Sequence, residues 1–194
     1  MLVLHSVGVH ALDQTLFLAL NLDRSAPPAW VSLALFASQG LPLLALAGLL
    51  VAAGVGKSRG RPAVLLALLS MGLAWSIATV LKHQIAAPRP FMLGLGTEWL
   101  GHSAGNGFPS SHAAVAMAFG VAMAFGPWRL PWRIGAVLCG LLVAWSRIAL
   151  GVHFPSDVLA AMVLGSGCAA LMHLAAARMR RSATPQHAGS PPRV

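Results

Sequence analysis

Long apolar stretches separated by short polar breaks account for most of this chain. A helix needs about 20 largely apolar residues to cross a bilayer. Five stretches meet or approach that length, and they cover residues 30–54, 62–81, 111–127, 131–150 and 155–177. The third is short, but it carries no Asp, Glu, Lys or Arg. We therefore predict an all-α integral membrane protein, built as a bundle of about five transmembrane helices.

The N-terminal stretch, residues 1–25, has a different pattern. Its polar and apolar side chains alternate with a short helical period: Asp13, Leu16, Phe17, Leu20 and Asn21. Amphipathic helices of this kind lie in the plane of the membrane interface. We therefore predict an N-terminal interfacial amphipathic helix, with a sixth span over the same residues as the alternative.

Composition supports a membrane protein and sets limits on its size. The chain has 194 residues, of which 57% are hydrophobic and only 9% charged, whereas a soluble domain carries about 25% charged residues. This length allows one compact membrane domain, which we place over residues 1–181 with its core motifs at 82–157. Residues 182–194 are polar and rich in proline and predict a disordered cytoplasmic tail. Cys139 and Cys168 lie in apolar segments and are expected to be buried free thiols.

The net charge of +9 does not indicate a nucleic-acid protein, because the basic residues lie between apolar runs and do not cover one face. With five spans, most of them fall on one side of the membrane: Lys57, Arg59, Arg61, Arg129, Arg133, Arg178, Arg180, Arg181 and Arg193. The positive-inside rule makes that side cytoplasmic. The long 83–110 loop and the short 147–154 loop then share the outer, periplasmic face of a bacterial inner membrane.

A first polar signature, Lys82 followed by Arg89-Pro90, lies where the second predicted span ends. A guanidinium grips phosphate oxygens in a bidentate manner, and an ammonium adds a compact point charge. This pair therefore indicates a phosphate site, with simple anchoring of the helix end at the interface as the alternative.

A second signature, Pro109-Ser110-Ser111-His112, opens the third predicted span. Serine is a favourable N-cap, and the free N–H groups of a helix start bind anions. The alternative is ordinary helix capping beside an interfacial histidine.

The third signature runs from Ser146-Arg147 through His153 to Asp157, one of only four acidic residues in the chain. An acid at a helix start complements the helix dipole. A carboxylate at membrane depth is nevertheless costly and usually functional. Asp157 is close enough in sequence to His153 to hold one imidazole nitrogen and make the other more nucleophilic.

In this order and spacing, the three signatures resemble those of the type 2 phosphatidic acid phosphatase superfamily, which includes membrane lipid phosphatases. Two segments are also similar to bacterial undecaprenyl-diphosphate phosphatases: 144–153, and the stretch from Leu16-Phe17 through Asn21 to Ser25-Ala26-Pro27. One departure is visible, since the position after Ser110 is often glycine in the superfamily and is Ser111 here.

The resemblance implies a role for each residue of the signatures. His153 would be the nucleophile that forms a phosphohistidine, Asp157 would orient it, and His112 would act as general acid and then activate water. The phosphate would be bound by the remaining polar residues: Lys82, Arg89, Ser110, Ser111 and Arg147. No metal or other cofactor is implied, because these side chains supply the positive charge.

The function indicated is hydrolysis of the terminal phosphate of undecaprenyl diphosphate at the periplasmic face. The same chemistry would serve a phosphatidylglycerophosphate or phosphatidate phosphatase, or a lipid A phosphotransferase. A non-enzymatic lipid-binding or flipping protein is the alternative from another class. In every case the partner is an isoprenoid or glycerolipid phosphate from the bilayer, and the oligomeric state stays open.

Three further polar residues lie in the outer loop: Glu98, His102 and Asn106. The default interpretation of this segment is a solvated loop, and the alternative is a lid over the lipid head group.

Overall fold

The computed structural model describes residues 2–55, 60–102 and 104–182 and is helical throughout its regular elements. In chain order these are α1 (Leu2–Leu20), α2 (Pro28–Leu35), the π-helical η1 (Phe36–Gly40), α3 (Leu41–Val55), α4 (Gly60–Gln84), the 3₁₀ turn η2 (Pro90–Leu93), α5 (Ser111–Phe125), α6 (Leu130–Ala149) and α7 (Pro155–Ser182). The predicted disordered tail lies outside the described residues, apart from Ser182, as do Lys57 and Arg59.

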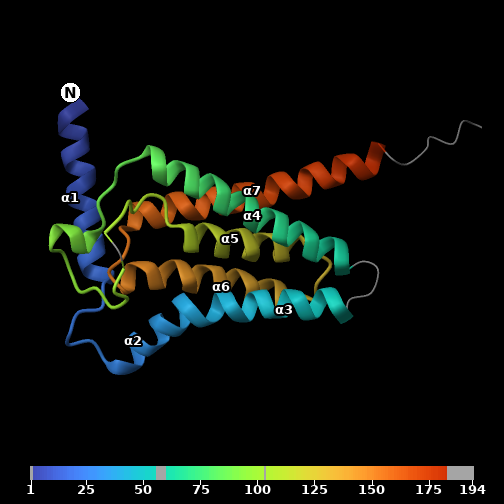
Figure 1. Cartoon of the computed structure of the whole chain (residues 1–194), viewed down its shortest axis with the longest axis horizontal. Helices are drawn as coiled ribbons and strands as arrows, with labels where there is room; N and C mark the ends of the chain where they lie inside the picture. Colours follow the sequence, from blue (N-terminus) through green and yellow to red (C-terminus); the bar gives the residue numbers. More distant parts are fainter. Residues whose placement is uncertain (1, 56–59, 103, 183–194) are drawn as a thin grey trace, which may run out of the picture.

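Four stretches of the described chain are long and apolar enough to cross a bilayer: Pro28–Val55, which joins α2, η1 and α3, then Gly60–Gln84, Leu130–Ala149 and Pro155–Ser182. Successive helices of the bundle run in opposite directions (Figure 1). This confirms the predicted all-α membrane fold. The last helix continues beyond residue 177, the end that the sequence predicted, because the arginine-rich segment stays helical up to Ser182.

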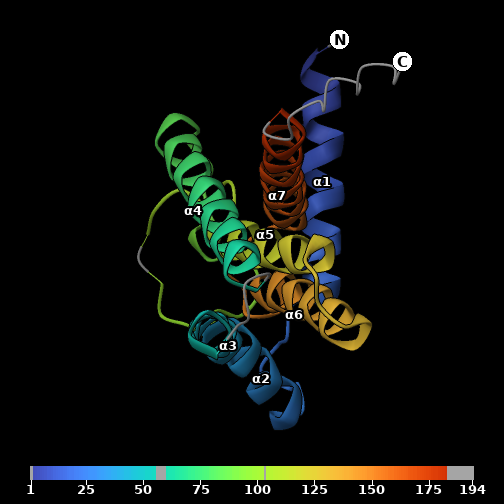
Figure 2. The same cartoon turned by 90° about the vertical axis from the view of Figure 1, so that its right-hand side faces the viewer.

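Helix α5 differs from the other spans in length and position. It has 15 residues, or about 22 Å of helix, against a hydrocarbon core of about 30 Å. Helices α4, α6 and α7 surround it in the view along the bundle (Figure 2). Its burial explains why an apolar but short segment is stable here, since protein and not lipid covers most of its surface.

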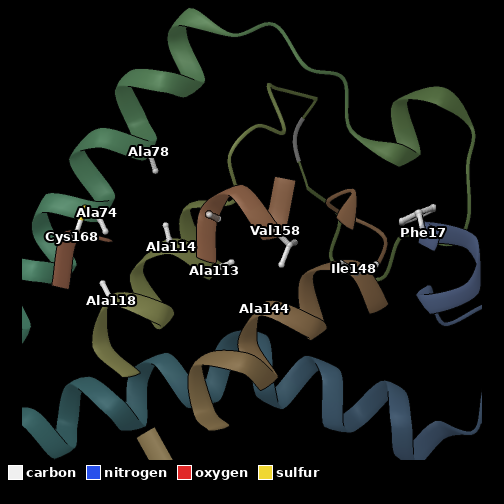
Figure 3. Packing of buried hydrophobic residues seen from close by; sticks show 11 residues of the cluster. Phe17, Ala74, Ala78, Ala113, Ala114, Ala118, Ala144, Ile148, Val158 and Cys168 are labelled. Carbon is white, nitrogen blue, oxygen red and sulfur yellow. The ribbon is translucent and has the colours of Figure 1, made fainter. Parts of the chain in front are cut away.

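Small side chains fill the interior of the bundle, and large apolar ones face outward. The main cluster is dominated by alanine and includes Ala74, Ala78, Ala113, Ala114 and Ala118 (Figure 3). Leucines such as Leu43, Leu65 and Leu159 are more than half exposed. An apolar exterior of this kind suits lipid as the surrounding solvent.

Glycines allow α5 to approach its neighbours closely. A Cβ added at Gly165 of α7 would lie 2.1 Å from the Ala114 carbonyl oxygen of α5. Additions at Gly120 and Gly140 would each lie 2.9 Å from a backbone carbonyl oxygen across the α5–α6 contact. Such contacts are typical of membrane helices, whose association depends on close packing.

Helix α1 lies across one end of the bundle and not along it (Figures 1 and 2), as expected for an interfacial helix and not for a sixth span. Asp13, Phe17 and Asn21, spaced four residues apart, face the protein. Asp13 accepts hydrogen bonds from the Ser156 N–H and hydroxyl at 2.9 and 2.5 Å, and the Phe17 ring packs edge-on against Phe154. The α1 face therefore holds the start of α7.

Candidate active site

All eight residues singled out in the sequence lie at the same end of the bundle, beside α1. Lys82 is in the last turn of α4, and Arg89 immediately precedes η2. Ser110, Ser111 and His112 are at the start of α5. The remaining three surround the α6–α7 turn: Arg147, His153 and Asp157. The alternating direction of the helices is what brings segments 75 residues apart (82 to 157) to one place.

His153 and Asp157 form a buried pair. Their exposed fractions are 2% and 4%, and His153 Nδ1 lies 3.5 Å from Asp157 Oδ2. The same oxygen accepts the Phe154 N–H at 3.0 Å, which fixes the carboxylate at the start of α7. Burial, reinforced by the charge of Arg147, lowers the pKa of His153 well below its usual value. The lowered pKa favours the neutral imidazole. Nδ1 makes no hydrogen bond to the described residues at this distance, and in the tautomer that carries hydrogen on Nδ1, facing Asp157, the lone pair is on Nε2.

Arg89 connects two loops next to this pair. Its Nε donates to the Gly105 carbonyl at 3.1 Å and its Nη1 to the Val152 carbonyl at 3.2 Å. Gly107 packs tightly beside both groups, because a Cβ there would lie 3.2 Å from Asp157 Oδ2 and 3.4 Å from the Arg89 side chain. Arg89 thus holds the backbone beside His153 and leaves its Nη2 without a hydrogen bond to the described residues.

Arg147 and Ser110 carry buried donors without protein partners. The Arg147 side chain is 1% exposed, and its two terminal nitrogens contact Ser38 Oγ and His102 Nε2, the latter at 3.2 Å. Its Nε and the Ser110 hydroxyl have no hydrogen-bond partner among the described residues. Ser110 occupies the N-cap position of α5 but makes no side-chain capping bond. Capping, the alternative interpretation from the sequence, is therefore wrong for its hydroxyl.

Lys82, Ser111 and His112 form a more open side. Lys82 Nζ donates to Ser111 Oγ at 3.2 Å, and the Lys82 carbonyl accepts from Asn106 Nδ2 at 2.8 Å. His112 is exposed and borders two cavities. One, of about 260 Å³, is mostly apolar and lies among α3, α4, α5 and α6; the other, of about 320 Å³, also includes Ser38, His102 and Arg147.

Sequence analysis missed three contributors to this end of the molecule. Ser38 lies inside a predicted span and gave no signal. His102 was assigned to a solvated loop or a lid over the head group, but it contacts Arg147. Asn21 was assigned to the amphipathic pattern and to the N-terminal resemblance, without a contact partner. Its side chain donates to the Thr97 and Ala149 carbonyls, both at 3.0 Å, and accepts the Thr97 N–H at 2.7 Å.

The described part of the segment between η2 and α5 is partly exposed, but it also makes specific hydrogen bonds. Glu98 accepts the backbone N–H of His102, and Trp99 donates from its indole to the Leu22 carbonyl at 2.8 Å. The loop is thus hydrogen-bonded within itself, to the segment that follows α1 and to the end of α4. In the described part of the chain, no group of three or more His, Cys, Asp or Glu side chains is placed to hold a metal ion.

A buried imidazole paired with a carboxylate, next to three cationic side chains at the end of a membrane bundle, is typical of enzymes that act on phosphate groups. The chain belongs to the PAP2 superfamily, whose family model matches residues 63–181. This range contains all three signatures, and it confirms the resemblance noted in the sequence. The protein is a multi-pass membrane lipid phosphatase.

Individual relatives agree with this assignment. YbjG of Escherichia coli K12, provisionally named an undecaprenyl-diphosphatase, is 33% identical over 164 residues, covering 81% of this chain and 79% of its own. The undecaprenyl-diphosphatase BcrC of Bacillus subtilis is 39% identical over 77 residues, 40% of this chain and 39% of its own. The crystal structure of a PAP2-type phosphatidylglycerolphosphate phosphatase from Bacillus subtilis has a TM-score of 0.66 and 26% identity, covering 90% of this chain and 89% of that one.

Proposed function

We propose that the protein hydrolyses undecaprenyl diphosphate to undecaprenyl phosphate and inorganic phosphate at the periplasmic face of the bacterial inner membrane. The observation that carries this proposal is the His153–Asp157 pair, buried beside unpartnered donors. A protein that only bound or moved lipid would need the cations but not an oriented neutral imidazole. The names of two relatives, YbjG and BcrC, support the choice of substrate.

In the proposed reaction, His153 Nε2 attacks the terminal phosphorus while the bond to the bridging oxygen breaks. Asp157 stabilises the imidazole, which gains positive charge as it becomes phosphorylated. His112 donates a proton to the leaving oxygen, so that undecaprenyl phosphate departs. His112 then accepts a proton from water, the water oxygen bonds to phosphorus, and His153 is released with inorganic phosphate.

The unpartnered donors suit the equatorial oxygens of the transferred phosphoryl group. Ser110 Oγ and Arg147 Nε are buried without hydrogen-bond partners among the residues that the structure describes, and each would gain a charge-assisted hydrogen bond when a phosphate binds. Arg89 and Lys82 add positive charge at the same place. Fixed donors of this kind stabilise charge that develops in the transition state and need no reorganisation during the reaction.

The apolar cavity offers a place for the start of the lipid chain. It is lined by Met71 and Trp75 of α4, Val115 and Phe119 of α5, and Val143 of α6. His112 forms part of its wall, which supports a general acid that would lie between the chain and the phosphate. At about 260 Å³ the cavity holds only the part of the chain nearest the diphosphate, and the remainder would lie in the bilayer.

The distribution of arginines supports the proposed orientation of the protein in the membrane. Five described arginines lie at the opposite end of the bundle or on the helix turns next to it: Arg61, Arg129, Arg133, Arg178 and Arg181. By the positive-inside rule that end is cytoplasmic, so the site faces the periplasm. Cysteines introduced at position 95 and at position 61, in a variant lacking Cys139 and Cys168, should react with an impermeant thiol reagent from opposite sides of the membrane. Labelling of both from one side would contradict the orientation.

A second substrate is favoured by the similarity to the phosphatidylglycerolphosphate phosphatase structure. Phosphate release by the purified protein should be compared on undecaprenyl diphosphate, phosphatidylglycerophosphate and phosphatidate in one detergent. We expect the highest kcat/KM on undecaprenyl diphosphate; equal values on all three, or a preference for a monophosphate, would overturn that choice. Acid-labile ³²P on the protein, absent from His153→Ala, would identify the phosphohistidine.

A further inference from the structure

Arg147 is held in an unusual way for a buried cation. Its contacts come from two parts of the chain outside the three signatures: Ser38 of η1, 109 residues away, and His102 of the outer loop, 45 residues away. Both are neutral acceptors, and no carboxylate is hydrogen-bonded to this guanidinium among the described residues. A buried charge without a counter-ion is costly, so this arrangement calls for an explanation.

Neutral acceptors fix a guanidinium without cancelling its charge. A carboxylate partner would compete with a phosphate for the same donors, whereas a hydroxyl and an imidazole leave the full positive charge available. With both terminal nitrogens engaged, the orientation of the planar group is set, and Nε is the buried donor that remains.

Ser38 contacts Arg147 from the π-helical part of the first span. The segment Phe36–Gly40 interrupts the α-helical pattern and carries Ser38 inward, where it is 2% exposed. Single π-helical turns inside α-helices are frequent at functional sites. The π-helical segment of the first span therefore contains the residue that contacts Arg147.

His102 is held from the other side. The Glu98 carboxylate accepts its backbone N–H, and the ring contacts Arg147 through Nε2. Burial, together with Arg147 and Arg89, lowers the pKa of His102 despite the opposing charge of Glu98. The ring is therefore neutral at pH 7, and the contact requires the tautomer with hydrogen on Nδ1, so that Nε2 accepts from Arg147.

We propose that Ser38 and His102 are positioning residues that hold Arg147 with its Nε directed at the transferred phosphate. The inference rests on the proposed function, because it assumes that Arg147 binds the phosphoryl group. It adds Ser38 of the first transmembrane span and His102 of the outer loop to a site whose signatures come from the end of α4, the start of η2, the start of α5 and the α6–α7 turn.

Substitutions that remove only the acceptor test this proposal. His102→Leu is expected to lower kcat/KM on undecaprenyl diphosphate about 30-fold and to weaken inorganic phosphate binding about tenfold, since one bond to a charged group is lost. His102→Gln keeps an acceptor oxygen and should stay within threefold of wild type. Ser38→Ala should lose about tenfold, while Ser38→Thr retains the hydroxyl and most of the activity.

Two matched controls separate these effects from packing. Ser70 is also fully buried in a membrane helix, but its hydroxyl donates to the Leu66 carbonyl of its own helix. His173 lies at the other end of the bundle and contacts the Ala169 carbonyl. Ser70→Ala and His173→Leu should leave kcat/KM within twofold of wild type.

The deciding measurement is a double-mutant cycle with Arg147→Ala. If His102 and Ser38 act through Arg147, their substitutions have less than a twofold effect once the guanidinium is gone. Equal losses in both backgrounds, or failure of His102→Gln to restore activity, would overturn the proposal. The cycle is also measured as the Kd for inorganic phosphate. A protein that binds phosphate but does not cleave undecaprenyl diphosphate would refute the proposed function, while the Kd cycle would still decide the positioning role.

Discussion

The two sides of the candidate site are built differently. On the side of the α6–α7 turn, Arg147, His153 and Asp157 are at most 4% exposed, and backbone or side-chain contacts hold each of them. On the side of α4 and α5, Lys82 is half-buried and His112 is exposed between two cavities. We call these the fixed side and the open side.

The difference between the two sides matches the part of the substrate that each is proposed to contact. The phosphoryl group is the same in every lipid phosphate, so the groups that attack and bind it benefit from rigid placement. The leaving group and its chain vary between lipids, and they would meet the open side. Substitutions on the fixed side should therefore affect all substrates equally, whereas those on the open side should depend on the substrate.

The largest effect is expected on the fixed side. His153→Ala removes the proposed nucleophile and should lower kcat by at least about 10⁴-fold on every substrate. Its effect on the Kd for inorganic phosphate should stay below about fivefold, because the cations remain. His173→Ala, at the opposite end, is the control. Turnover within tenfold of wild type in His153→Ala would exclude this residue as nucleophile.

His112→Ala should give the next largest effect, and one that varies with the substrate. Loss of a general acid costs about 10²–10⁴-fold when the leaving group is a poor one. We expect a loss of about 10³-fold on phosphatidylglycerophosphate, whose leaving group is an alcohol. On p-nitrophenyl phosphate, which needs little protonation, about tenfold is expected. The same factor on both compounds would contradict the assignment.

Filling the apolar cavity should change substrate selection with little effect on the chemistry. Ala45 of α3 lines the cavity, whereas Ala52, two turns along the same helix, does not. Ala45→Phe should raise KM for undecaprenyl diphosphate about tenfold and leave p-nitrophenyl phosphate hydrolysis within twofold. Ala52→Phe is the matched control. Equal changes on both compounds would argue against chain binding in this cavity.

The smallest effect concerns stability and pH. His102 and His153 have folded-state pKa values lowered by burial. The unfolded chain therefore binds more protons than the folded one as the pH falls below about 6.5, the ordinary histidine pKa. The contribution of these two histidines to stability is complete above that pH and is lost below it. We expect Tm in detergent to drop by a few degrees between pH 7 and pH 5, and less in His102→Gln. A Tm that rises on acidification would contradict the neutral state of both rings.

The sequence could predict the fold because long apolar runs leave few alternatives in a membrane. It also located the fixed side, since Arg147, His153 and Asp157 are only ten residues apart and share one turn. Contacts across the bundle could not be predicted. Ser38 meets Arg147 over 109 residues, and Asn21 meets Thr97 over 76. No short sequence motif links the two residues of either pair. Each pair forms only because the folded chain brings two distant segments together.

The length of α5 has a further consequence for how this protein depends on its host membrane. Its neighbours α4 and α7 have 25 and 28 residues and adapt to the lipid around them by tilting. Since α5 is enclosed by those neighbours, hydrophobic mismatch acts on the outer helices, while the depth of His112 is set by contacts such as that between Gly165 and Ala114. Turnover should therefore vary little between vesicles of short-chain and long-chain phospholipids.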